Sequence, residues 1–461
     1  MEHKRFGAIQ LPQAKLARLL AFGLVLVSLK LYSGWGSAPA VAPAPSPPAA
    51  APLPSEDRAA DQTIRFLEDR VRRDPEDFGA YNRLAGSYLQ RLRETGNTEY
   101  LSLAFRAARR SLDVIPAERN IGGLSALAQA EYASHEFAAA RDHALQLTEL
   151  DAGKSYPYGM LGDALLELGE YEEATEAFRQ MAARSGQSVG TDTRLARLAA
   201  LRGETERAQG HLFTALAFAL DLPVPPRETV AWCRWQFGEA AFAVGDYETA
   251  ERHYRDALVT FPGYYNALAS LGRVRAARGD IAAAIEQYED VVLRLPDPTF
   301  VAALGDLYTL AGRPDDAATQ YALVEQIARL SALNGALYNR QLALFYADHD
   351  LNADVAYANA VAEYQERRDV YGADAVAWTA LKAGKLAEAQ AAMQEALRLG
   401  TRDARLFYHA GMIARAAGDE ATARDDLERA LALNPGFDPL QSHIARGVVA
   451  ALGEGARYGL K

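Results

Sequence analysis

Cysteine is almost absent from the chain, which has 461 residues and one thiol, Cys233. A single cysteine excludes an intramolecular disulfide and a Cys-x-x-Cys metal site. The chain also has no excess of positive charge, because 60 acidic residues outnumber 49 Lys and Arg and give a net charge of −11. Since nucleic-acid-binding faces need clustered basic residues, we expect no nucleic-acid partner. An apolar fraction of 49% excludes a wholly disordered chain.

Long apolar runs are equally scarce, and the one strong example lies at residues 19–29. Eleven uncharged residues fit the core of a signal peptide but are few for the ~20 of a membrane-spanning helix. The flanks that extend the run to a marginal span are Arg18, Lys30, Tyr32 and Trp35. We interpret residues 1–35 as a signal anchor, with a cleaved signal peptide or a bland buried or amphipathic segment as alternatives.

The charge distribution predicts which side of a membrane the chain occupies. The first 55 residues hold five Lys or Arg against one Glu, a net +4, which leaves −15 for the rest. Basic residues before an apolar segment stay in the cytoplasm. We therefore expect residues 56–461 outside it, either anchored in a periplasm-like compartment or released there or secreted after cleavage. Residues 36–55 contain seven Pro and seven Ala, a composition that predicts an extended polyproline II linker.

One pattern recurs from residue 77 to residue 435. An apolar residue precedes Gly or Ala, a turn follows, and then come an Ala and a large residue four positions later, as in Gly162, Gly169, Ala174 and Phe178. Five of the nine spacings between successive small positions are 34 residues. Apolar spacings of three and four specify helices, and a mid-unit Gly followed by Asp or Glu ends one helix and starts the next. The small positions are Ala104, Ala140, Ala174, Ala208, Ala250, Ala284, Ala317, Val355, Ala389 and Ala423.

These residues match the W-x2-L-G-x2-Y…A-x3-F…P frame, and the chain resembles the tetratricopeptide repeat (TPR) family. The resemblance implies an all-α, right-handed superhelical solenoid of about ten helix-turn-helix repeats over residues 77–435. Solenoid ends need a polar outer face. We therefore expect capping helices within residues 56–76 and 436–461.

The resemblance also implies that the first helix of each repeat lines a concave, partner-binding face. Projecting the sequence onto that frame places nine residues there: Trp232, Trp235, Phe242, Arg194, Arg197, Arg273, Arg340, Trp378 and Tyr408. Aromatic residues on repeat helices can instead be core, as we expect for Phe237 and Tyr254. Aromatic anchors beside arginines would suit a partner segment with apolar anchors and acidic flanks.

The sequence holds no spacing of titratable residues typical of an enzyme or a metal site. Residues 348–354 begin like a calcium loop, but Ala353 replaces the required Gly and Asn359 the closing Glu, so we interpret them as a polar turn. We expect no cofactor and no catalysis. The sequence favours a cell-envelope adaptor that binds a client protein, as part of an export, pilus or polysaccharide-assembly complex. A self-associating structural solenoid is the alternative, and an enzyme with an unrecognised site the least favoured one.

Overall fold

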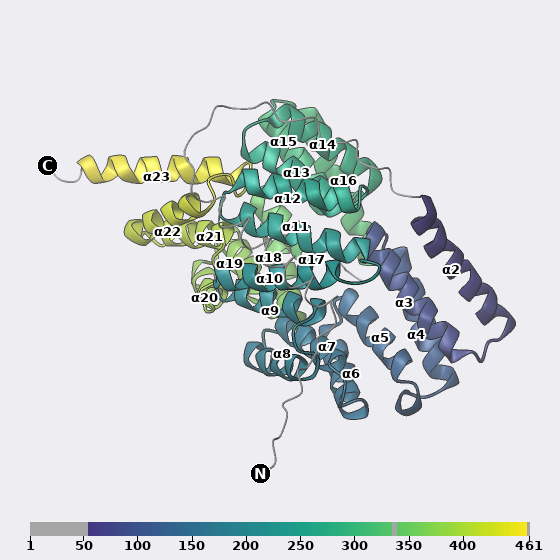
Figure 1. The fold of residues 1–461 in the computed structure, drawn as a ribbon. Helices are drawn as coiled ribbons and strands as arrows, with labels where there is room; N and C mark the ends of the chain where they lie inside the picture. The colour runs from purple at the N-terminus through teal and green to yellow at the C-terminus, as the bar shows by residue number, and fades with distance from the viewer. Residues whose placement is uncertain (1–53, 334–338, 459–461) are drawn as a thin grey trace, which may run out of the picture. The chain divides into compact units, whose positions relative to one another are not determined.

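The structure is a computed structural model that describes residues 54–333 and 339–458 (Figure 1). These residues belong to one compact unit, Ala50–Lys461. The segment expected to be a signal or anchor, and nearly all of the Pro/Ala-rich linker, lie outside the described residues. Within the described ranges, no helix has both the length and the apolarity that a membrane crossing needs.

All regular secondary structure in the described ranges is helical, as the sequence predicts. The α-helices are α2 (Pro54–Arg73), α3 (Phe78–Thr95), α4 (Glu99–Val114), α5 (Ile121–Ala133), α6 (Phe137–Leu150), α7 (Tyr156–Glu167), α8 (Tyr171–Ser185), α9 (Val189–Leu201), α10 (Thr205–Leu220), α11 (Arg227–Ala243), α12 (Tyr247–Thr260), α13 (Tyr265–Ala277), α14 (Ile281–Arg294), α15 (Pro298–Leu310), α16 (Pro314–Leu333), α17 (Asn339–Asp348), α18 (Ala353–Glu366), α19 (Val370–Lys382), α20 (Leu386–Ala396), α21 (Ala404–Ala416), α22 (Glu420–Leu433) and α23 (Gln441–Tyr458).

The helices from α3 to α22 form ten antiparallel pairs, which are the ten predicted repeats of an α-solenoid. A tight turn joins the two helices of a pair, and the α11–α12 turn shows why. Gly245 has a φ of 75°, a left-handed conformation that is costly for residues with a Cβ. Asp246 then caps α12, because its carboxylate accepts a hydrogen bond from the N–H of Thr249 at 3.1 Å. Glycine therefore reverses the chain and aspartate restarts the helix.

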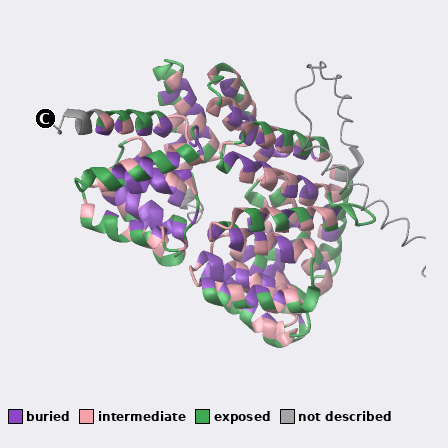
Figure 2. Cartoon of the chain, turned by 60° about the vertical axis from the view of Figure 1, so that its left-hand side comes forward, coloured by how far each residue is buried: buried purple, intermediate pink, exposed green. Residues whose placement is uncertain are grey.

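Paired helices approach closely because an aromatic ring of the second helix lies on a glycine of the first. A Cβ on Gly162 would be 2.3 Å from the ring of Phe178, and one on Gly238 would be 2.2 Å from the ring of Tyr254. The same contact recurs between Gly305 and Tyr321. Buried residues gather where helices face one another, and exposed ones lie on the outward faces (Figure 2).

Nine of the ten predicted small positions are buried, and Val355 is the exception. Its side chain is 52% exposed, whereas Ala356 is fully buried. The turn before α18 contains two residues with left-handed backbone, Asp350 and Asn352. This irregular turn shifts the register by one residue, so Ala356 is the packing position of that repeat.

Helices flank the array at both described ends. Leu67 of α2 is buried, and Glu68 of the same helix accepts a hydrogen bond from the hydroxyl of Tyr88 on α3 at 2.7 Å. At the other end, Val448 and Leu452 of α23 are buried, whereas Ile444 is exposed.

The repeats also contact one another across about 200 residues of sequence. The N–H of Val370 donates to the hydroxyl of Tyr171 at 2.9 Å, and Thr401 donates to the carbonyl of Leu201. One repeat further along, the side chain of Asn434 donates to the carbonyl of Phe242 at 2.7 Å. We call these contacts the seam. It joins the turns of the third, fourth and fifth repeats to the loops that follow the eighth, ninth and tenth.

Candidate functional site

The first helices of the repeats form an inner surface that contains two cavities. The larger cavity has a volume of about 1430 Å³ and is lined by α3, α5, α7, α9 and α11, the first helices of five successive repeats. Tyr371 and the loop residues 401–403 close it from the far side of the seam. The lining of this cavity therefore combines side chains from five repeats.

The two predicted arginines in the wall of the larger cavity, Arg194 and Arg197, are ion-paired within the protein. The guanidinium of Arg194 on α9 lies 2.6 Å from the carboxylate of Asp163 on α7. Arg197 pairs with Glu167, which also lies 2.6 Å from Arg367 across the seam. Burial alone would raise the pKa of Glu167, but the positive charges of Arg197 and Arg367 outweigh burial and lower it to about 2. This carboxylate is therefore ionised and neutralised at neutral pH.

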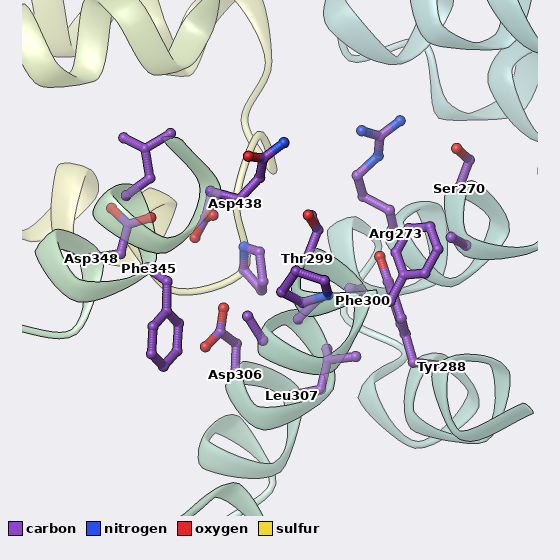
Figure 3. A pocket seen from close by; sticks show the side chains of 18 of the residues that line it. Ser270, Arg273, Tyr288, Thr299, Phe300, Asp306, Leu307, Phe345, Asp348 and Asp438 are labelled. Carbon is purple, nitrogen blue, oxygen red and sulfur yellow. The ribbon is translucent and has the colours of Figure 1, made fainter. Parts of the chain in front are cut away.

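The smaller cavity has a volume of about 300 Å³ and continues along the inner surface (Figure 3). The first helices α11, α13, α15 and α17 line it, together with Arg405 of α21 and residues 437–439. Trp235 lies in its wall, and the indole N–H of Trp235 donates to the hydroxyl of Ser270 at 3.0 Å. The loop between α22 and α23 thus packs against the inner surface of the middle repeats.

The structure brings five of the nine predicted site residues to these cavities. Trp232, Arg194 and Arg197 line the larger one, and Trp235 and Arg273 line the smaller one. Both tryptophans are partly buried and pack against the core of the fifth repeat. The three arginines are not free to attract an acidic partner segment, because each is ion-paired within the protein. The partner of Arg273 is Glu239. The predicted preference for acidic flanks on a partner therefore has no support in these residues.

The other four predicted site residues are structural, and the prediction that they face a partner was wrong. Trp378 and Tyr408 are each only 1% exposed, and their rings pack at a tilt of 57° in the core of the last repeats. Phe242 is buried beneath the guanidinium of Arg273. Arg340 is buried between Glu363 and Asp369, at 3.0 and 2.9 Å. Phe237, expected in the core, is partly exposed and stacks on His253. The prediction therefore exchanged the two phenylalanines of α11, because Phe242 is the buried one and Phe237 the partly exposed one.

Sequence reasoning missed the acidic residues of the inner surface, although a signal for them exists. Asp163, Glu239 and Asp306 each directly follow the glycine on which an aromatic ring packs. A residue one step beyond a glycine that faces the second helix turns toward the inner surface. Arg273 follows Gly272 in the same way and pairs with Glu239 of the preceding repeat. The position after the packing glycine therefore carries the polar groups of this surface.

Two observations on the described residues concern metal binding and thiol reactivity. No group of three or more His, Cys, Asp or Glu side chains within the described ranges is arranged to hold a metal ion. Cys233 is fully buried, and burial raises the pKa of its thiol to about 12, so it stays protonated at neutral pH.

Comparison with known proteins identifies the repeats. A model of the tetratricopeptide repeat family matches residues 125–189, 236–298, 271–332 and 375–436. The chain belongs to this family, as its sequence pattern and its helix pairs indicate. No curated protein matches the sequence.

Several solved structures match part of this chain at low sequence identity. TTC0263, a thermophilic TPR protein of Thermus thermophilus, shares 17% identity over 41% of this chain and 98% of its own, with a TM-score of 0.35. PilW, a type IV pilus biogenesis factor, shares 17% identity over 44% of this chain and 91% of its own, with a TM-score of 0.38. MamA shares 21% identity over 37% of this chain and 96% of its own, with a TM-score of 0.30.

Proposed function

We propose that the chain is a non-enzymatic scaffold whose inner surface binds a segment of a partner protein. The observation that carries this proposal is the larger cavity, because five successive first helices line it. Tetratricopeptide repeats generally serve protein interaction, and solenoids present such extended surfaces to partners. An extended segment that lies along the cavity would contact several repeats at once. Many weak contacts would then together give a specific interface.

The proposal places the repeats in the cell envelope, with the N-terminal segment as anchor or export signal. The support is the sequence alone: an apolar run at residues 19–29, basic residues before it and a Pro/Ala-rich linker after it. A reporter that is active only in the cytoplasm, fused after Lys461, should be inactive. An active reporter would refute the envelope location but not partner binding.

The binding role is tested by filling the larger cavity. Gln129 on α5 lines it, is exposed, and hydrogen-bonds only within its own helix. The Gln129→Trp substitution should block a partner segment without disturbing the core. The matched control is Leu145→Trp on α6, in the second helix of the same repeat, where the side chain is 50% exposed.

Affinity purification of the full chain from its own cells provides the readout. We expect the Gln129→Trp variant to lose its co-purifying partner and the Leu145→Trp variant to keep it. A partner that Gln129→Trp retains at wild-type level would refute the larger cavity as its binding site.

A further inference from the structure

The smaller cavity has an acidic side on which the carboxylates outnumber the basic groups. Figure 3 shows Asp306, Asp348 and Asp438 on one side, and Ser270, Arg273 and Tyr288 on the other. Glu239, the partner of Arg273, adds a fourth carboxylate to the lining. Arg273 pairs with Glu239, Arg405 with Asp438 and His349 with Asp306. Two negative charges therefore remain in the lining when His349 is neutral, and one remains when it is protonated. A positive occupant would balance them.

Two of these carboxylates keep one oxygen atom without a hydrogen bond in the described part of the chain. Asp306 accepts from Tyr321 and His349 through Oδ1, at 2.8 and 2.7 Å. Asp348 likewise uses Oδ1 for the indole of Trp378 and the amide of Gln441. Their Oδ2 atoms accept nothing from any described residue. Each carboxylate is thus held in place by one oxygen and has acceptor capacity left on the other.

Two further polar groups of the walls have no partner among the described residues. Tyr288 is 6% exposed, lies in the cavity wall and makes no hydrogen bond through its hydroxyl. The Nε–H of Arg273 is buried and has no acceptor. Buried polar groups normally have partners. The hydroxyl of Tyr288 and the free carboxylate oxygens are the groups that this cavity offers to an occupant.

The cavity is open to solvent. The side chains of Arg273 and Arg405 in its walls remain 35% and 42% exposed. A metal ion does not suit the arrangement, because no three metal-ligating side chains converge among the described residues. A volume of about 300 Å³ lies at the lower end of ligand pockets and accommodates one long side chain rather than a helix.

We propose that the smaller cavity binds an arginine side chain of a partner segment, with its guanidinium directed at Asp306 and Asp348. This inference rests on the proposed scaffold function and names the chemistry of the partner. Arginine brings several N–H donors in a plane, which suits two carboxylates with free oxygens. The rings of Phe300 and Phe345 in the wall can stack on that plane.

The electrostatics of the carboxylates agree with this assignment. Burial raises the pKa of both Asp306 and Asp348, and the negative charge of Asp438 adds to the rise, although hydrogen bonds and nearby positive charge oppose it. The charged forms are therefore held at a cost that a bound cation would relieve.

The test is a titration of the full chain with two peptides, acetyl-Gly-Ala-Arg-Ala-Gly-amide and the same peptide with citrulline in place of arginine. Citrulline keeps the shape of arginine and removes its charge. We expect the arginine peptide to bind at least ~10-fold more tightly, since charge-assisted hydrogen bonds are lost with citrulline. Equal affinity for the two peptides would overturn the inference.

Three variants locate the binding. Asp348→Asn keeps an oxygen for Trp378 and Gln441 but removes the charge, and Tyr288→Phe removes a hydroxyl that has no described partner; both should weaken binding several-fold. Asp315→Asn removes an exposed charge on α16 and should bind as the wild type does. Undiminished binding by the first two, or equal weakening in all three, would show general attraction to an acidic chain. If Asp348→Asn does not fold, Tyr288→Phe decides.

The two proposals fail separately. If partner capture depends on Gln129 but the arginine peptide does not bind, only the arginine site is overturned. If partner capture is indifferent to Gln129→Trp, the proposed function fails whatever the peptides do.

Discussion

Tyr171 and Val370 are separated by 199 positions, yet the hydroxyl of Tyr171 accepts a hydrogen bond from the N–H of Val370 at 2.9 Å. Both residues are 1% exposed. Because no water reaches this donor, the seam depends on that hydroxyl. The contact ties the third repeat to the ninth and helps to enclose the larger cavity.

Replacing Tyr171 with Phe should destabilise the chain. The substitution leaves the N–H of Val370 buried without an acceptor, at a cost of about 1–3 kcal/mol. Urea denaturation measures the loss, and hydrogen exchange should show faster exchange at Val370. Tyr81→Phe is the control, because Tyr81 on α3 makes no hydrogen bond through its hydroxyl to any described residue. An equal effect of both variants would mean that the seam bond is not formed.

Glu167, the buried partner of Arg197, should be important for stability. Its removal as Glu167→Gln leaves Arg197 and Arg367 without their shared negative partner, at a cost of about 3–5 kcal/mol. The exposed Glu173→Gln on the neighbouring helix α8 should change the free energy of unfolding by less than ~0.5 kcal/mol.

The pH dependence of this contribution follows from the lowered pKa. The pKa of Glu167 in the folded chain is about 2, below its ordinary value of 4.5. The stabilisation is therefore fully present above 4.5 and is lost as the pH falls through 2. Acid titration of the unfolding free energy should bring wild type and Glu167→Gln together at low pH. A difference that persists unchanged at pH ~2 would contradict the ion-pair account.

The close approach of paired helices predicts intolerance at the packing glycines. In Gly162→Ala the new methyl carbon would meet the ring of Phe178 at 2.3 Å, and such overpacking costs about 1–3 kcal/mol. Gly210→Ala on α10 is the control, because no atom lies within 4 Å of the added carbon and alanine favours a helix. Thermal melting should fall for the first and hold or rise for the second; the reverse order would refute the packing.

We expect His143 to make the stability of the fold depend on pH in the direction opposite to that of Glu167. Its Nδ1 lies 2.7 Å from the carboxylate of Glu131, and that hydrogen bond, against the effect of burial, raises the pKa of His143. A raised folded pKa means that the stabilisation is present below about 6.5 and is lost as the pH rises through the folded value. Melting curves between pH ~6 and ~8.5 should show this loss in the wild type and not in Glu131→Gln. The same slope in both would contradict it.

The repeats could be predicted because the packing that creates them is local. Glycine and aromatic positions such as Gly238 and Tyr254 lie within one repeat, so their spacing is visible in the sequence. The one misplaced position, Val355, follows a turn with the left-handed residues Asp350 and Asn352, and no spacing rule anticipates such a turn. Tertiary geometry thus shifted one register within an otherwise regular array.

The site could be predicted only in part because its polar contacts are not local. In the sequence alone, Arg273 has no evident partner, because Glu239, with which it pairs in the structure, lies one repeat earlier. Arg340 is neutralised by residues on the following helix and loop, and the seam joins positions about 200 apart. Burial of Trp378 and Tyr408 likewise depends on the last repeats packing together. Helical phase alone does not reveal these contacts.

Photo-crosslinking in cells tests most directly whether the inner surface binds a partner. A crosslinkable amino acid is placed at Gln129, inside the larger cavity, or at Leu145, exposed on the second helix of the same repeat. We expect one discrete crosslinked protein from Gln129 and none of that mass from Leu145. Crosslinks to that protein from Leu145 alone, or equally from both positions, would contradict this expectation.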